Sequence, residues 1–106
     1  MYSSDLDIQK INTLIEDIRS GRISRNKNYF TLTEVTAFSR FKRAKLLMSL
    51  IDDLNYTATV FGNNIEVVKG STLFEVRLFN PILKYRRRVT ISEAELDIIR
   101  SRTGLS

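Results

Sequence analysis

The spacing of apolar residues changes near residue 56, and this change constrains the fold more than any other feature of the chain. Before it, apolar residues recur every three to four positions, which is typical of helices. After it, they alternate with polar residues, as in strands that bury one face, and turn signals interrupt the alternation at Gly62-Asn63, Gly70-Ser71 and Asn80-Pro81. Helices followed by strands indicate the α+β class.

The turn signals also predict how the strands pair. Two-residue loops would place Val60 opposite Ile65 and Val67 opposite Phe74. The third loop is either Asn80-Pro81 or Pro81-Ile82, and both choices continue the same apolar face through Val76, Leu78, Leu83, Tyr85 and Val89. We therefore predict a four-stranded antiparallel meander whose first strand begins at Tyr56.

Three helices are expected around this meander. The first covers residues 4–20, where Ser4 and Asp7 have the spacing of a cap and Gly21 ends the helix. The second covers residues 33–54, either as one helix or as two helices with a break near Ser39. A capping box at Ser92 and Glu95 begins the third. The predicted order is α-α-β-β-β-β-α in a single domain of residues 1–106, with helices on one sheet face. A winged-helix-like arrangement is the alternative.

Composition excludes several classes of activity. The 106 residues contain no His and no Cys, which removes the commonest general base and metal ligand as well as thiol chemistry. Gly-rich phosphate loops and paired-carboxylate arrangements are also absent from the sequence. We therefore expect a protein that is not an enzyme and that uses no cofactor or metal. The sequence contains no apolar run long enough to cross a membrane and no cationic secretory start, so we expect a cytoplasmic protein without a membrane partner.

Positive charge is concentrated in two segments. Eight cations and one anion lie between residues 19 and 45, and four cations lie within residues 84–88. These segments carry eleven net positive charges, whereas the remainder of the chain carries six net negative charges. Such polarisation favours an anionic partner for one side of the molecule, although a solvated basic face that only improves solubility gives the same pattern.

The tract of residues 82–91 supplies the first candidate site. Its cations are interleaved with apolar residues at period two, which indicates a structured strand rather than a disordered basic tail. On the sheet face away from the helices, cations would contact phosphates and aromatic rings would stack on bases. The residues assigned to this site are Arg77, Lys84, Arg86, Arg88, Phe61 and Phe79.

The same face has a structural interpretation. Phe61, Val68, Leu73 and Phe79 would then form a homodimer or protein interface, and Glu75 would pair across the strands with Arg86 or Arg88.

Arg87 breaks the pattern, because a regular strand places it on the apolar face with Tyr85 and Val89. A buried charge needs a partner. We expect Arg87 to extend beyond the helices, to stack on an aromatic ring such as Phe74, to meet a carboxylate, or to return to solvent through a β-bulge.

The second candidate site lies in the early part of the second helical region and comprises Arg40, Lys42, Arg43 and Lys45. A helix with such a cluster can lie against DNA, and a solvated helix face is the alternative. The leading hypothesis is a small non-catalytic nucleic-acid-binding or regulatory module that binds DNA or RNA. The competing hypothesis is a protein-interaction module, with an acidic protein or a second copy of the chain as its partner.

Overall fold

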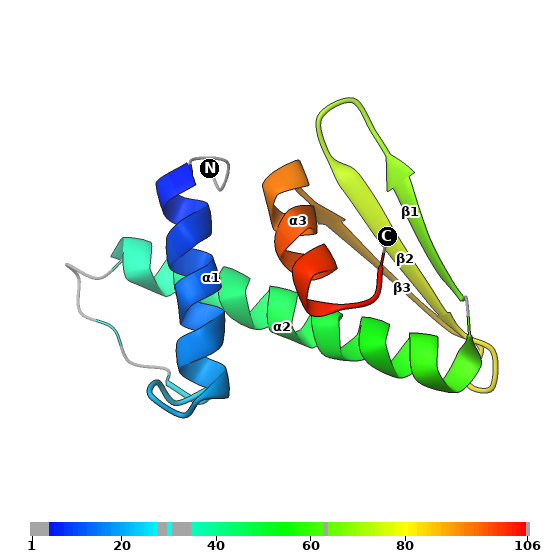
Figure 1. Cartoon of the computed structure of the whole chain (residues 1–106), viewed down its shortest axis with the longest axis horizontal. Helices are drawn as coiled ribbons and strands as arrows, with labels where there is room; N and C mark the ends of the chain where they lie inside the picture. The colour runs from blue at the N-terminus through cyan, green and yellow to red at the C-terminus, as the bar shows by residue number, and fades with distance from the viewer. Residues whose placement is uncertain (1–4, 28–29, 31–34, 63, 106) are drawn as a thin grey trace. The chain divides into compact units, whose positions relative to one another are not determined.

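The computed structural model describes residues 5–27, 30, 35–62 and 64–105. Within them, the order of elements is α1 (Asp5–Arg19), α2 (Val35–Phe61), β1 (Ile65–Lys69), β2 (Phe74–Asn80), β3 (Tyr85–Ile91) and α3 (Glu93–Arg102) (Figure 1). The α+β class is confirmed, with three helices and a three-stranded antiparallel sheet among these residues. The chain divides into two compact units, residues 1–48 and 49–106, and the single domain stays a prediction.

Unit 1 contains α1 and the first part of α2. The predicted apolar stripe of α1 is buried at Ile11, Ile15 and Ile18. An ion pair of 2.9 Å between Arg40 Nε of α2 and Asp7 Oδ1 of α1 links the two helices. The predicted first helix is confirmed from Asp5, whereas its proposed cap at Ser4 lies outside the described residues.

The second helix is one continuous helix from Val35 to Phe61, without a break at Ser39. The prediction of a first strand over residues 56–61 is therefore wrong. The buried positions explain the difference, because they continue the helical spacing through Leu50, Leu54 and Thr57. A strand would have directed Tyr56 and Val60 to the core, but both are exposed.

Gly62 ends this helix rather than beginning a hairpin. Its φ is +67°, in the left-handed region that is common directly after a helix, and Asn64 Nδ2 donates a 2.7 Å hydrogen bond to the carbonyl of Phe61. The helical hydrogen bonds and this cap outweigh the small preference of Thr, Val and Phe for strands.

The sheet has the order β1-β2-β3, and its turns are longer than predicted. Val67 lies opposite Val76, not Phe74, because residues 70–73 form a four-residue turn between the paired Lys69 and Phe74. Asn80 pairs with Tyr85 across a second four-residue turn, which removes Leu83 from the strand. Both corrections shift the register by an even number of residues, so the side chains keep the predicted faces.

Unit 2 packs this sheet against helices on one face. Val76, Leu78 and Ile91 are buried there, together with Leu96 and Ile99 of α3. The predicted capping box is confirmed: Ser92 Oγ accepts from the Glu95 amide at 3.2 Å, and Glu95 Oε1 accepts from the Ser92 amide at 3.0 Å. The described elements thus form a three-stranded meander followed by a helix, and the predicted order α-α-β-β-β-β-α with four strands is wrong.

The left-handed conformation of Gly62 predicts a local stability effect. No atom lies within 4 Å of a Cβ at either Gly62 or Gly104, but only Gly62 has a positive φ. Gly62→Ala should therefore lower the free energy of unfolding by about 1 kcal/mol through backbone strain alone. Gly104→Ala is the matched control and should leave it nearly unchanged in urea denaturation. Equal effects of the two substitutions would contradict the assigned helix end.

Candidate nucleic-acid interface

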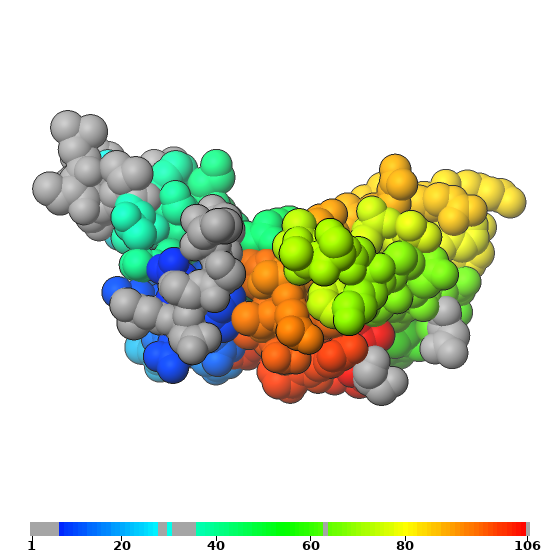
Figure 2. Space-filling view, turned by 90° about the horizontal axis from the view of Figure 1, so that it is seen from above, coloured from blue at the N-terminus to red at the C-terminus, as the bar shows by residue number. Residues whose placement is uncertain are grey.

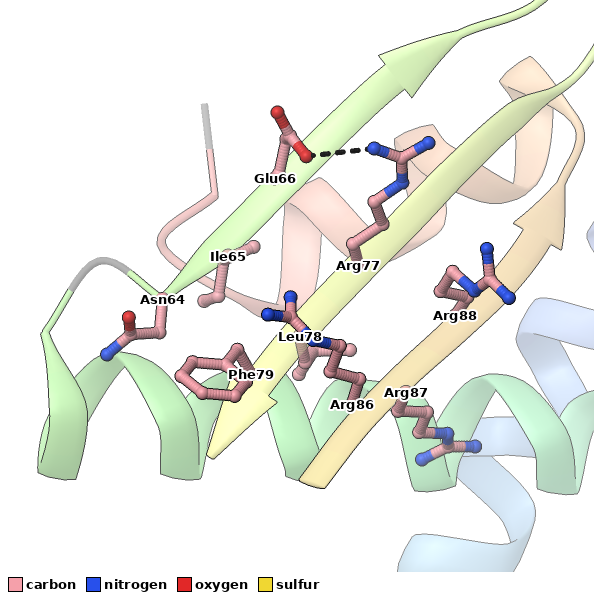
Figure 3. A pocket seen from close by; sticks show the side chains of 9 residues that line it. All are labelled: Asn64, Ile65, Glu66, Arg77, Leu78, Phe79, Arg86, Arg87 and Arg88. Carbon is pink, nitrogen blue, oxygen red and sulfur yellow. Dashed lines mark hydrogen bonds and ion pairs between the residues drawn. The ribbon is translucent and has the colours of Figure 1, made fainter. Parts of the chain in front are cut away.

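The open face of the sheet carries the charged residues of β2 and β3. Arg77 lies opposite Arg88, and Phe79 lies opposite Arg86. Figure 3 shows these four side chains in front of the sheet, with the helical ribbons behind it. They line a shallow hollow of about 330 Å³. Sequence analysis correctly assigned all four to this face.

Arg77 is already paired within the sheet. Its NH1 group lies 3.1 Å from Glu66 Oε1 on β1, and its Nε donates to Glu75 Oε1 on its own strand. Hydrogen bonds from Arg77 to Glu75 and then to Glu66 raise the pKa of Arg77 above its ordinary value. The expected pairing of Glu75 with Arg86 or Arg88 is wrong, because Glu75 lies opposite Thr90 and binds Arg77. Two carboxylates thus compensate Arg77, and the unbalanced charge of this face lies on β3.

Arg86 covers the ring of Phe79. The guanidinium carbon lies 4.5 Å from the ring centroid, a cation–π contact across the two strands. This contact does not neutralise the arginine. Among the described residues, Arg86 and Arg88 have no carboxylate partner, and neither does Lys84. These three residues are here called the β3 cation row. Arg86 and Arg88 lie on β3, at the edge of the sheet, and Lys84 lies in the turn directly before it.

Two residues of the predicted site lie elsewhere. Lys84 is in the turn before β3, with φ +56°, rather than on the open face of the strand. Phe61 is the last residue of α2 and makes an edge-to-face contact with Tyr56, with ring centroids 5.9 Å apart. Leu73, which the alternative interpretation assigned to a protein interface on this face, lies in the β1–β2 turn instead. Phe61 is displaced because the strand on which it was predicted is helical, and Lys84 because the turn is longer.

Arg87 meets a carboxylate, one of the expected solutions. It points away from the open face (Figure 3) and forms an ion pair with Asp53 of α2, while its NH1 group donates to Ser49 Oγ at 3.1 Å. Its side chain is only 17% exposed, whereas that of Asp53 is 49% exposed. Sequence analysis missed these partners. The available signal was the four-residue spacing of Ser49 and Asp53, which places both on one side of a helix.

The four cations of the second candidate site make two kinds of contact. Arg40 is paired with Asp7, and Arg43 also has an interaction within the chain. Lys42 and Lys45 lie over aromatic rings, each with Nζ 5.2 Å from the centroid of Phe38 or Phe41. All four residues lie on the part of α2 that belongs to unit 1, and the role of the cluster stays a prediction.

The described residues contain no cluster of three or more acidic side chains suited to hold a metal ion. No helix in the described part of the chain combines the length and apolar character needed to span a membrane. Comparison with protein-family models, curated proteins and solved structures finds no match to this chain.

The low exposure of Arg87 predicts a measurable coupling free energy between Arg87 and Asp53. A double-mutant cycle with Asp53→Asn and Arg87→Met should give a coupling free energy of about 1 kcal/mol in urea denaturation, because Arg87 is mostly shielded from water. The ion pair of Arg22 and Asp17 at 2.9 Å, with a largely exposed arginine, is the matched control. Its cycle should give about 0.3 kcal/mol. A coupling for Arg87 no larger than the control would contradict the assigned contact.

Proposed function

We propose that this chain is a small non-catalytic nucleic-acid-binding module whose contact surface centres on β3. The observation that supports the proposal is the β3 cation row: Lys84, Arg86 and Arg88 lie close in sequence and have no carboxylate partner among the described residues. Neighbouring cations of unit 2 are compensated, Arg77 by Glu66 and Glu75, and Arg87 by Asp53. A polyanion would supply the charge that the row lacks.

The geometry of the row suits a phosphate backbone. Arg86 and Arg88 project from the same face two residues apart, which corresponds to roughly 6.6 Å along a strand. Arginine presents several donors that match phosphate oxygens, and the Phe79 ring orients Arg86 through their cation–π contact. Arg77, the remaining predicted site residue on this face, then acts chiefly by joining β1 to β2.

The competing hypothesis of a homodimer or acidic protein partner has less support. Of its four proposed apolar contacts, only Val68 and Phe79 lie on strands of the sheet, and Arg86 lies over the Phe79 ring. Pairing of β3 with a second copy of itself would also bring like charges together, which disfavours association through an exposed edge. Light scattering tests the homodimer form of this hypothesis directly, since that form requires a dimer in solution.

Electrophoretic titration against single- and double-stranded DNA and RNA tests the proposal. The logarithm of the binding constant should fall linearly with the logarithm of salt concentration. For three phosphate contacts to a single strand the slope should be about −2.

The double substitution Arg86→Gln/Arg88→Gln should weaken binding and make this slope shallower by about 1.4, because two phosphate contacts are lost. Lys69→Gln/Arg100→Gln is the matched control. It removes the same charge from exposed residues of unit 2 that lie outside the row, and it should leave the slope unchanged. The proposal is wrong if the wild-type chain binds none of the four nucleic acids at low salt, or if the control pair weakens binding equally.

A further inference from the structure

A second hollow, of about 220 Å³, lies on the helix-facing side of β3. Two aromatic side chains line it from different elements, Tyr56 of α2 and Tyr85 of β3. They are 56% and 55% exposed, although the alternating pattern predicted both on a buried face. Leu83 of the β2–β3 turn is 73% exposed and lines the same hollow, and buried Leu78 contributes to it. The ion pair of Arg87 and Asp53 lines it as well. The hollow therefore combines exposed aromatic and apolar walls with one internally compensated pair of charges.

The walls are held in place by contacts within unit 2. The Tyr56 ring is supported by its edge-to-face contact with Phe61. The turn that presents Leu83 is braced by Asn80, whose Oδ1 accepts hydrogen bonds from the amides of Ile82 and Leu83, each at 3.0 Å. Pro81 restricts the backbone of the same turn. Figure 2 shows this yellow segment standing out at the end of unit 2. A binding partner would therefore meet an ordered surface.

The hollow adjoins the β3 cation row along the chain. Tyr85 follows Lys84 and precedes Arg86, and successive strand residues project to opposite faces. Because β3 is an edge strand, a ligand can contact its open face and pass around the edge to the hollow. A nucleotide in a single strand has the matching chemistry, a phosphate for the cations and a flat ring for stacking on tyrosine.

We propose that this hollow receives one unpaired base of a single-stranded nucleic acid whose phosphates contact the β3 cation row. The inference rests on the proposed function and specifies its ligand. A base inside a duplex is already stacked and paired, so the site should prefer a single strand over the duplex of the same sequence. Asn80 and Thr57 also line the hollow and give it polar groups beside the aromatic walls.

The experiment separates base binding from phosphate binding. The probes are a thymidine 12-mer, a uridine 12-mer and an abasic 12-mer, which keeps the phosphates but has no bases. The wild-type chain should bind both base-containing strands more tightly than the abasic strand. Tyr85→Ala should weaken binding of the thymidine strand by about 5- to 150-fold and should not affect the abasic strand, because one stacking contact is lost.

Matched variants control for folding and for the tyrosine hydroxyl. Tyr85→Phe keeps the ring and should bind the thymidine strand within about twofold of the wild-type chain. Leu73→Ala removes another exposed apolar side chain, in the β1–β2 turn, and should have no effect. Tyr56→Ala provides a second test from the opposite wall of the hollow. Because the chain contains four Tyr and no Trp, quenching of tyrosine fluorescence by the oligonucleotide gives an independent readout.

The outcomes distinguish this inference from the proposed function. Binding of the abasic strand as tightly as the thymidine strand, or unchanged binding by Tyr85→Ala and Tyr56→Ala, would overturn the base site and leave the cation row standing. Absence of binding to every oligonucleotide would overturn both, and a dimer that is lost in Tyr85→Ala would assign the hollow to a second copy of the chain instead. Loss of binding to a base-containing strand in Tyr85→Ala would support the base site, and tighter wild-type binding of the thymidine than of the uridine strand would identify the thymidine strand as the better ligand.

Discussion

The ion pair between Arg87 and Asp53 connects the basic tract to the rest of unit 2. The residues that follow in β3, Val89 and Ile91, must face the helices because Ile91 is fully buried. Strand geometry then places Arg87 on the same face, where an uncompensated charge would be costly. Asp53 compensates it from α2, with Ser49 as a second acceptor one helical turn earlier. With Arg87 held on this side, Arg86 and Arg88 must project from the other.

This arrangement divides the cations of residues 77–88 into two groups. Arg77 and Arg87 join elements, since the first links β1 to β2 and the second links β3 to α2. The β3 cation row pairs with no carboxylate among the described residues and stands at a sheet edge, where charge also discourages pairing with another strand. Protection of the edge and recognition of a polyanion require the same residues in the same place. A binding measurement with nucleic acid distinguishes the two roles, because a row that only protects the sheet edge needs no ligand.

Sequence analysis was accurate where a local rule and the tertiary fold agree. The capping box at Ser92 has its own hydrogen bonds and formed as predicted. The faces of β2 and β3 were also correct, although each turn is two residues longer than predicted. A register shift by an even number of residues preserves the side on which a residue lies. Residues 56–61 were assigned wrongly because Gly62 is compatible with both a hairpin and a helix end, and their alternating pattern favours a strand.

In the candidate site, too, the residues placed by a local pattern were predicted correctly and the others were not. Arg86, Arg88, Arg77 and Phe79 were predicted together because period two in a strand is a local property. Phe61 and Lys84 were misplaced because each depended on the ends of an element, which local patterns define poorly. The hollow beside Tyr56 and Tyr85 could not be predicted, because its walls come from a helix and a strand about thirty residues apart.

The sequence by itself determined the α+β class, the third helix with its cap, and the alternation that separates Arg87 from Arg86 and Arg88. Only the tertiary structure decided that α2 continues to Phe61 and that Asp53 meets Arg87. It also decided that, within the described part of the chain, carboxylates compensate Arg77 but not the β3 cation row. The physical reason is the distance along the sequence over which each property is set. Periodicity and capping depend on residues a few positions apart, whereas the compensation of a charge depends on which side chain packing brings beside it.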